Sequence, residues 1–303
     1  MLSYNEGSVN TFVSSTENII ISVSDDGSIT IFSDFAYKIL QKIKNAHNGI
    51  IFDISLKDIK NFATCSQDRS IKTWIKGEKN DYILDKSIND AHEDDIHKIE
   101  FLKDNTIISG SKDTTIKIFN LVIFVWIIYY CYYTNYQCFI TLNNNIRVYS
   151  LIYIQEKNLL MSTGTEYTIF WNLTNILNPF ITKIEAFCHG KNAFQILDKN
   201  RTVVGGRDNI QIISIEDKKI IKQIKTEFLV WAISVVENKN LFICGGVSND
   251  ISIYSTQTYD NLGIFKECHE GRIRGIYLLK NGKIMTGSED KKTKIWEILF
   301  EEN

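Results

Sequence analysis

Residues 46–74 decide the fold, and they read AHNGIIFDISLKDIKNFATCSQDRSIKTW. After His47-Asn48-Gly49 come two runs rich in β-branched and aromatic residues, IIFDISL and NFATCS. A polar turn, QDRS, separates them from a third run of the same kind, SIKTWI. Short apolar runs broken by Gly, Asp and Asn predict strands joined by tight turns. The carboxylate of Asp68 suits such a turn, because it can accept hydrogen bonds from the turn N–H groups.

The same pattern returns along the chain. Four clear copies are SDDGSITIF ending at Phe32, SQDRSIKTW at Trp74, SKDTTIKIF at Phe119 and SEDKKTKIW at Trp296. Each copy has an Asp six residues before its closing aromatic residue and a Ser or Thr four residues before that Asp. These are Asp26, Asp68, Asp113 and Asp290, with Ser22, Thr64, Ser109 and Thr286. Weaker copies are TGTEYTIFW, GGRDNIQII and GGVSNDISIY, ending at Trp171, Ile213 and Tyr254.

The repeat period predicts the architecture. Successive copies end 41 to 52 residues apart, and a fourth strand follows in each repeat, as in Lys38–Ile43 and Lys218–Ile224. Four antiparallel strands cannot bury both faces alone, whereas blades packed around an axis can. We therefore expect an all-β fold, a seven-bladed β-propeller of four-stranded antiparallel blades. It forms one domain over residues 1–303, with blades ending near 32, 74, 119, 171, 213, 254 and 296.

Over essentially its whole length the chain resembles the WD-repeat (Trp-Asp repeat) propellers. Their signature is a Gly-His or Ala-His-like pair, about two strands, the Asp turn and a closing Trp. The His position is matched by Ala46-His47, Ala91-His92, Cys188-His189 and Cys268-His269. The resemblance implies that the His, Ser or Thr, Asp and Trp of one repeat form a buried hydrogen-bond chain. Two repeats have complete sets: His47, Thr64, Asp68 and Trp74, and His269, Thr286, Asp290 and Trp296.

The other repeats carry only part of this set. In the third, His92, Ser109 and Asp113 are present, but Phe119 has no N–H to donate. The fourth to sixth are more degenerate, so we expect the middle of the ring to depend more on apolar packing. A Ser-His-Asp catalytic triad is disfavoured, because these residues recur at the repeat period and catalytic groups do not.

Three other clusters have plainer explanations than a binding site. His92–His97 (HEDDIH) is an acidic turn rather than a metal site, because no second cluster completes a coordination shell. Gly205-Gly206 and Gly245-Gly246 lack the Gly-Lys-Ser/Thr sequence of a phosphate loop and indicate close backbone approach. The basic run in 280–294 is interleaved with acids, which favours a solvated face over a patch for an acidic partner. We expect no metal and no cofactor.

The composition limits location and partners. The net charge of −2 over 303 residues gives no electrostatic case for nucleic acid or an anionic membrane. Six scattered cysteines without a CxxC pair fit a reduced intracellular compartment. The segment MLSYNEGSVN has neither a basic nor an apolar stretch, so it is not a signal peptide. We expect a cytoplasmic protein, with the nucleus as the alternative.

Two features depart from a simple propeller. The apolar run LVIFVWIIYYCYY, residues 121–133, belongs to an insertion at about 121–134 that is too short to span a membrane. It is either a sticky inter-blade loop or a translated intron in an imperfect gene model. In the last blade, only Glu297–Asn303 follow Trp296, which leaves three good strands and a stub. Either the chain is part of a longer protein, or the open edge is tolerated, or a partner's strand pairs with it.

The function that these patterns favour is a non-catalytic protein–protein interaction scaffold that presents blade-top loops to partner proteins or peptides. In the WD family the residue just before the turn Asp often faces the top surface. That position nominates Asp25, Gln67, Lys112 and Glu289 as candidate partner-binding residues. The alternative is a regulatory or substrate-recognition propeller from a larger enzyme, such as a kinase or ubiquitin ligase. An open reading frame that continues past Asn303 or begins before Met1 would favour the alternative.

Overall fold

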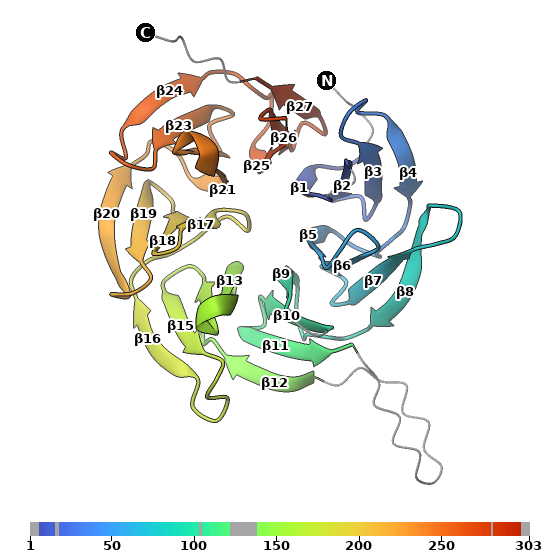
Figure 1. Cartoon of the computed structure of the whole chain (residues 1–303), viewed down its shortest axis with the longest axis horizontal. Coiled ribbons are helices and arrows are strands. Elements are labelled where there is room, and N and C mark those ends of the chain that lie inside the picture. The colour runs from blue at the N-terminus through green and yellow to red at the C-terminus, as the bar shows by residue number, and fades with distance from the viewer. Residues whose placement is uncertain (1–5, 16–17, 103–104, 122–137, 280, 298–303) are drawn as a thin grey trace.

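Seven small antiparallel sheets stand in a ring around a central axis (Figure 1). The computed structural model describes residues 6–15, 18–102, 105–121, 138–279 and 281–297. Within these ranges the strands β1 to β27 follow one another in chain order, four to a sheet in blades 1 to 6 and three in blade 7. The predicted seven-bladed propeller is confirmed.

The blades follow the repeats closely. Blade 1 holds β1 (Val9–Ser14), β2 (Ile19–Ser24), β3 (Ile29–Ser33) and β4 (Ile39–Ile43); blade 2 holds β5 (Ile51–Leu56), β6 (Asn61–Ser66), β7 (Ile71–Lys76) and β8 (Tyr82–Ile88). Blade 3 holds β9 (Ile96–Phe101), β10 (Thr106–Ser111), β11 (Thr115–Asn120) and β12 (Cys138–Asn143); blade 4 holds β13 (Ser150–Ile154), β14 (Leu159–Thr163), β15 (Thr168–Asn172) and β16 (Phe180–Ile184). Blade 5 holds β17 (Phe194–Asp198), β18 (Arg201–Gly205), β19 (Asn209–Ser214) and β20 (Lys219–Lys225); blade 6 holds β21 (Val230–Val236), β22 (Leu241–Gly246), β23 (Ile251–Ser255) and β24 (Asn261–Phe265). Blade 7 holds β25 (Ile273–Leu278), β26 (Ile284–Ser288) and β27 (Thr293–Trp296), and two 3-10 turns are Gln155–Lys157 and Glu237–Lys239.

The burial of each strand follows its distance from the axis. The first strand of each blade lies nearest the axis of the ring, and the fourth lies at the rim (Figure 1). Second strands are sandwiched between neighbouring blades, so even the alternating residues of β14 and β22 are all buried. The rim strand β20, by contrast, is largely exposed. Radial packing thus buries the second strands on both faces, including the Ser and Thr residues that they carry.

A bulge marks the closing residue of each repeat. In blades 1 to 6 the pairing of the third and fourth strands shifts register at the repeat's last residue, which is Phe32, Trp74, Phe119, Trp171, Ile213 or Tyr254. Bulges increase the local twist of a strand pair and redirect a side chain. The last residue of each of these repeats, which the sequence pattern identified, therefore also lies at a bulge in the backbone.

Glycines make room between neighbouring blades. A Cβ at Gly205 of blade 5 would lie 2.5 Å from a methyl of Val230 at the start of blade 6. At Gly287 of blade 7 it would lie 2.8 Å from a methyl of Val9 at the start of blade 1. The predicted close approach at the glycine pairs is present. The same packing closes the ring between its last and first blades.

Blade 7 has three strands among the described residues, as the sequence indicated. Among the described residues, blades 7 and 1 do not share a sheet, and they pack through an apolar cluster of Val9, Phe12, Ile20, Phe32, Leu279 and Met285. The insertion predicted at about 121–134 lies outside the described residues, which omit 122–137, except for Leu121, which is buried. No helix in the described ranges is long and apolar enough to cross a membrane.

Candidate interaction site

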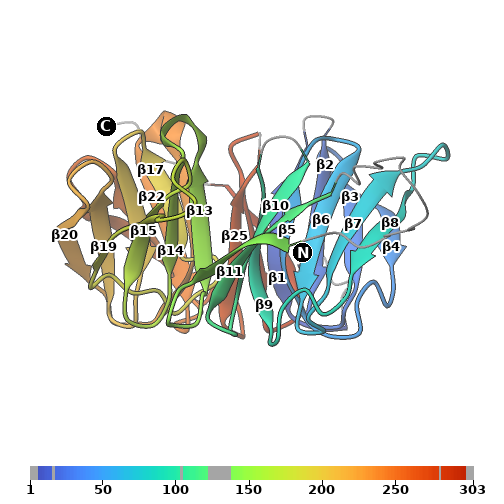
Figure 2. The same ribbon diagram turned by 90° about the horizontal axis from the view of Figure 1, so that it is seen from below.

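Turns at one end of the blades carry the four candidate partner-binding residues, Asp25, Gln67, Lys112 and Glu289. In each blade the first strand starts at this end and the second returns to it, because the strands are antiparallel and run between the two faces of the ring (Figure 2). The turn between the second and third strands therefore lies beside the loop that enters the first strand. We call this side of the ring the turn face.

The four set residues of blade 2 form one continuous relay. Trp74 Nε1 donates to Thr64 Oγ1 at 2.9 Å, and Thr64 Oγ1 lies 2.8 Å from His47 Nε2. His47 Nδ1 lies 3.0 Å from Asp68 Oδ2. The indole N–H can only donate and an ionised carboxylate can only accept, so the protons are fixed. Thr64 donates to Nε2, and neutral His47 donates from Nδ1 to Asp68.

The electrostatics agree with this assignment. Burial lowers the pKa of His47 below its usual 6.5, even though Asp68 acts in the opposite direction. Burial raises the pKa of Asp68, but hydrogen bonds from His47 and Ser70 outweigh it and hold that pKa well below 3.8. The relay therefore holds a neutral imidazole against a carboxylate. The Asp68 carboxylate also accepts the N–H groups of Asn48 and Ser70, and so ties the loop to the turn.

Blade 7 repeats this geometry. Trp296 Nε1 donates to Thr286 Oγ1 at 2.8 Å, and His269 lies 2.7 Å from Thr286 and 2.9 Å from Asp290. Both complete sets that the sequence nominated are thus brought together by the fold.

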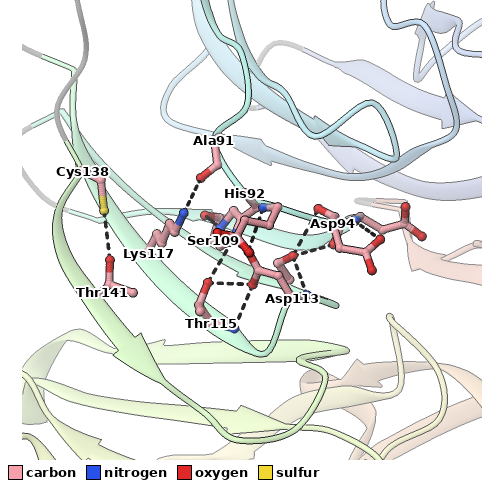
Figure 3. Close-up of polar contacts among 12 residues, drawn as sticks. Ala91, His92, Asp94, Ser109, Asp113, Thr115, Lys117, Cys138 and Thr141 are labelled. Carbon is pink, nitrogen blue, oxygen red and sulfur yellow. Dashed lines mark hydrogen bonds and ion pairs between the residues drawn. The ribbon is translucent and has the colours of Figure 1, made fainter.

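Blade 3 holds a shortened relay (Figure 3). His92 Nε2 lies 2.7 Å from Ser109 Oγ, and His92 Nδ1 lies 2.8 Å from Asp113. Thr115 donates to Asp113 at 2.7 Å, as Ser70 does to Asp68 in blade 2. Phe119 contacts the His92 ring edge-on and donates no hydrogen bond.

Blade 4 has a relay that the sequence pattern missed. Trp171 Nε1 donates to Ser162 Oγ at 2.8 Å, and Ser162 donates to Asn144 Oδ1 at 2.6 Å. Asn144 takes the place of the His, one residue further from the Ser than in blade 2. A search that allowed Asn at the His position and a shift of one residue would have found it.

His189 of blade 5 does not join a relay, although the sequence placed it at a repeat His position. Its Nδ1 is buried with no hydrogen-bond partner within the described chain. Burial lowers its pKa, and its ring meets Phe187 edge-on. His189 instead lines a cavity on the turn face near the axis of the ring, and we call the place where this cavity opens the channel mouth.

The four candidate partner-binding residues all lie on the turn face, but in different surroundings. Asp25 and Glu289 are joined by Arg274, which donates to Asp25 at 3.1 Å and to Glu289 at 2.8 Å. These contacts link blade 1 to blade 7. Lys112 pairs with Asp94 at 3.1 Å within blade 3. Gln67 is exposed.

A cavity of about 260 Å³ opens at the channel mouth on the turn face. It is lined from five blades, by residues that include Asn10, Phe52, Lys191, Trp231 and Arg274. The guanidinium carbons of Arg272 and Arg274 lie 5.2 and 5.6 Å from the centre of the Trp231 ring. Exposed positive charge and an aromatic ring thus meet at the centre of this face.

The histidines of the HEDDIH segment make hydrogen bonds and ring contacts within the fold. No group of three or more His, Cys, Asp or Glu that could hold a metal is found among the described residues. Within the HEDDIH segment, His92 belongs to the relay and His97 stacks on Tyr149, with its Nδ1 donating to Val148 O. Burial lowers the pKa of His97 to about 3, so that ring is neutral.

The comparison with protein-family models agrees with the architecture. The model described as WD domain, G-beta repeat matches residues 85–120 and 260–297. These segments include the third-blade and seventh-blade Asp turns, with Asp113 and Asp290. No curated protein matches the chain significantly. Two segments of the chain thus match the WD-repeat model, and the ring of seven blades is consistent with a WD-repeat family.

Proposed function

We propose that the chain is a non-catalytic scaffold that binds another protein through the turn face. The observation that carries this proposal is the cavity at the channel mouth, where side chains from five blades meet around Trp231 and two arginines. Tryptophan and arginine are enriched among residues that dominate binding energy at protein interfaces. WD-repeat propellers are commonly interaction scaffolds, which supports the same proposal.

The relays argue against catalysis at this face. A general base needs a ring nitrogen that can reach a substrate proton. In blades 2, 3 and 7 both imidazole nitrogens are already engaged with a hydroxyl and a carboxylate. These histidines hold loops against turns and thereby fix the surface that a partner would meet.

A double substitution on the turn face tests the proposal. Gln67→Ala with Lys112→Ala removes two candidate residues whose contacts lie within single blades. We expect weaker capture of partner proteins from a lysate of the source cells, with a melting temperature within about 2 °C of the parent, because surface substitutions change stability little. Glu289 is left in place, since its bond to Arg274 helps to close the ring.

The matched control lies at the opposite end of the same blade. Glu78→Ala with Lys79→Ala changes two exposed residues in the turn between β7 and β8. Capture should be unaltered by this control. Equal capture by both double variants would contradict the assignment of the turn face.

A further inference from the structure

The loop that enters blade 5 reaches across the channel mouth. In Figure 1 the segment before β17 projects toward the centre of the ring. Asn192 Nδ2 donates to Asn10 O of blade 1 at 2.9 Å and to Arg274 O of blade 7 at 3.1 Å. Lys191 Nζ lies over the ring of Phe52 in blade 2, 2.8 Å from its centre. We call residues 185–193 the crossing loop.

Lys191 is a largely buried cation held by an aromatic ring. Contact with Phe52 stabilises an ammonium, but less than a carboxylate would in the same place. Within the described ranges no carboxylate lies at ion-pair distance from its Nζ. Burial lowers the pKa of Lys191 to about 7, with Arg274 acting in the same direction and Asp95 and Asp25 opposing it.

The acidic residues around the mouth already have cationic partners. Asp25 binds Arg274, as does Glu289. Asp95 lies 3.7 Å from Lys112, which also binds Asp94. Of the two basic residues that line the cavity, Arg274 therefore has acidic partners and Lys191 forms no ion pair with the described residues.

His189 supplies a second unsatisfied group in the same cavity. Its buried Nδ1 makes no hydrogen bond to the described residues. A buried polar atom without a partner destabilises the folded state, so a hydrogen bond from a ligand at this atom would be favourable. With the proton on Nδ1, the neutral ring could donate to an acceptor that enters the cavity.

We propose that this cavity binds a single carboxylate carried by an extended segment of the partner protein, with Lys191 pairing the charge and His189 donating a hydrogen bond. This inference rests on the proposed binding function of the turn face. The cavity, about 260 Å³, is smaller than the roughly 300–1,000 Å³ typical of small-molecule sites, which suits one side chain or chain terminus. A singly charged group fits better than a dianionic phosphate, because Asp25 and Asp95 lie close enough to Lys191 to influence it.

Binding should be coupled to proton uptake. With a pKa of about 7, part of the Lys191 population is neutral at pH 7, and a bound carboxylate favours the ammonium form. Affinity should therefore fall as the pH rises above about 7. The charged and titratable groups that interact electrostatically with Lys191 are Asp25, Cys65, Asp95, His97 and Arg274. Burial keeps Cys65 protonated and His97 neutral in this range.

The experiment uses three fluorescein-labelled heptapeptides and the full chain. The first has a central Glu and an amidated C-terminus, the second has Gln in place of Glu, and the third is the Gln peptide with a free C-terminal carboxylate. Fluorescence anisotropy is measured between pH 6 and pH 8.5. We expect one of the two carboxylate peptides to bind the parent protein at least about tenfold more tightly than the neutral one, a difference of about 1.4 kcal/mol. Whichever peptide is preferred identifies the carboxylate as a side chain or a terminus.

Two variants decide whether the preference comes from Lys191. Lys191→Met should abolish it without loss of fold, since burying an ammonium is costly, and Lys79→Met on the opposite face should preserve it. Equal binding of all three peptides by the parent protein would overturn the inference, as would a preference that survives in Lys191→Met. Capture that depends on Gln67 and Lys112, together with no carboxylate preference, would reject this inference and leave the proposed function standing.

Discussion

Blades 2 and 5 share one four-strand plan but are held together by different interactions. Blade 2 ties its loop, turn and third strand together by the relay from Trp74 to Asp68. In blade 5 the positions that correspond to Thr64 and Trp74 hold the apolar residues Val204 and Ile213. Both are fully buried in the largest apolar cluster, which also includes residues of blades 4 and 6. His189, released from a relay, lines the channel mouth. A repeat without the hydrogen-bond relay can thus keep its fold through apolar packing. The residue at its His position can then line a surface cavity.

The largest expected loss of stability comes from disrupting the apolar packing of blade 5. Ile213→Ala should destabilise the protein by about 3–4 kcal/mol, because it leaves a cavity at a fully buried site. Chemical denaturation of the variant measures the change. Ile213→Val should lose about 1 kcal/mol, and similar losses for both would show that the site collapses around the smaller side chain.

Disrupting the hydrogen-bond relay of blade 2 should lower the free energy of unfolding by slightly less. Thr64→Val keeps the shape of the side chain but leaves the Trp74 N–H and His47 Nε2 without their shared partner. We expect a loss of about 2–3 kcal/mol in the free energy of unfolding, because both groups are buried. The matched exchange in blade 5, Val204→Thr, should also destabilise, since it buries a hydroxyl in an apolar cluster. A neutral Thr64→Val would show that the relay contributes nothing to stability.

The pH dependence of stability sharpens the comparison further. The pKa of His47 is lowered by burial, so below pH 6.5 the unfolded chain takes up a proton that the folded chain resists. Stability therefore falls as the pH drops below about 6.5. The lowered pKa of Asp68 adds a second loss as the pH falls below about 3.8.

Glutamine variants separate the two histidines. His47→Gln should flatten the stability profile between pH 6.5 and 5 and lower the melting temperature at pH 8. His189→Gln should flatten it as well, because burial lowers the pKa of His189 too. Its melting temperature at pH 8 should stay near that of the parent, since its Nδ1 makes no hydrogen bond to the described residues. A large loss at pH 8 in His189→Gln would instead assign that residue a structural role.

The smallest expected effect comes from making blade 2 resemble blade 3. Trp74→Phe removes one hydrogen bond to Thr64 Oγ1 and leaves the contact between Thr64 and His47. The expected loss is about 1 kcal/mol, the usual net value of one hydrogen bond, together with a small packing change. Thermal unfolding at pH 8 measures it. A loss as large as that of Thr64→Val would mean that packing of the indole outweighs its N–H.

Strong local signals made much of this molecule predictable from its sequence. The Asp turns and closing aromatic residues recur because each blade must solve the same packing problem, and they led directly to the fold and to the relays of blades 2 and 7. The relay of blade 4 was missed because Asn144 replaces a His at a shifted spacing. The channel mouth was missed for a different reason. Asn10, Lys191 and Arg274 belong to different repeats, and only closure of the ring brings them together.

The closure between blades 7 and 1 has a consequence for folding kinetics. Arg274 and Asn10 are 264 positions apart in the chain, and Tyr277 and Ser14 are 263 apart. Contacts of such long sequence separation carry a large loop-closure entropy and form late. Among the described residues the two blades share no strand, so side-chain contacts hold this junction together. It should form last during folding and open first under native conditions, so amide exchange in β1 and β25 should report opening of the ring before global unfolding.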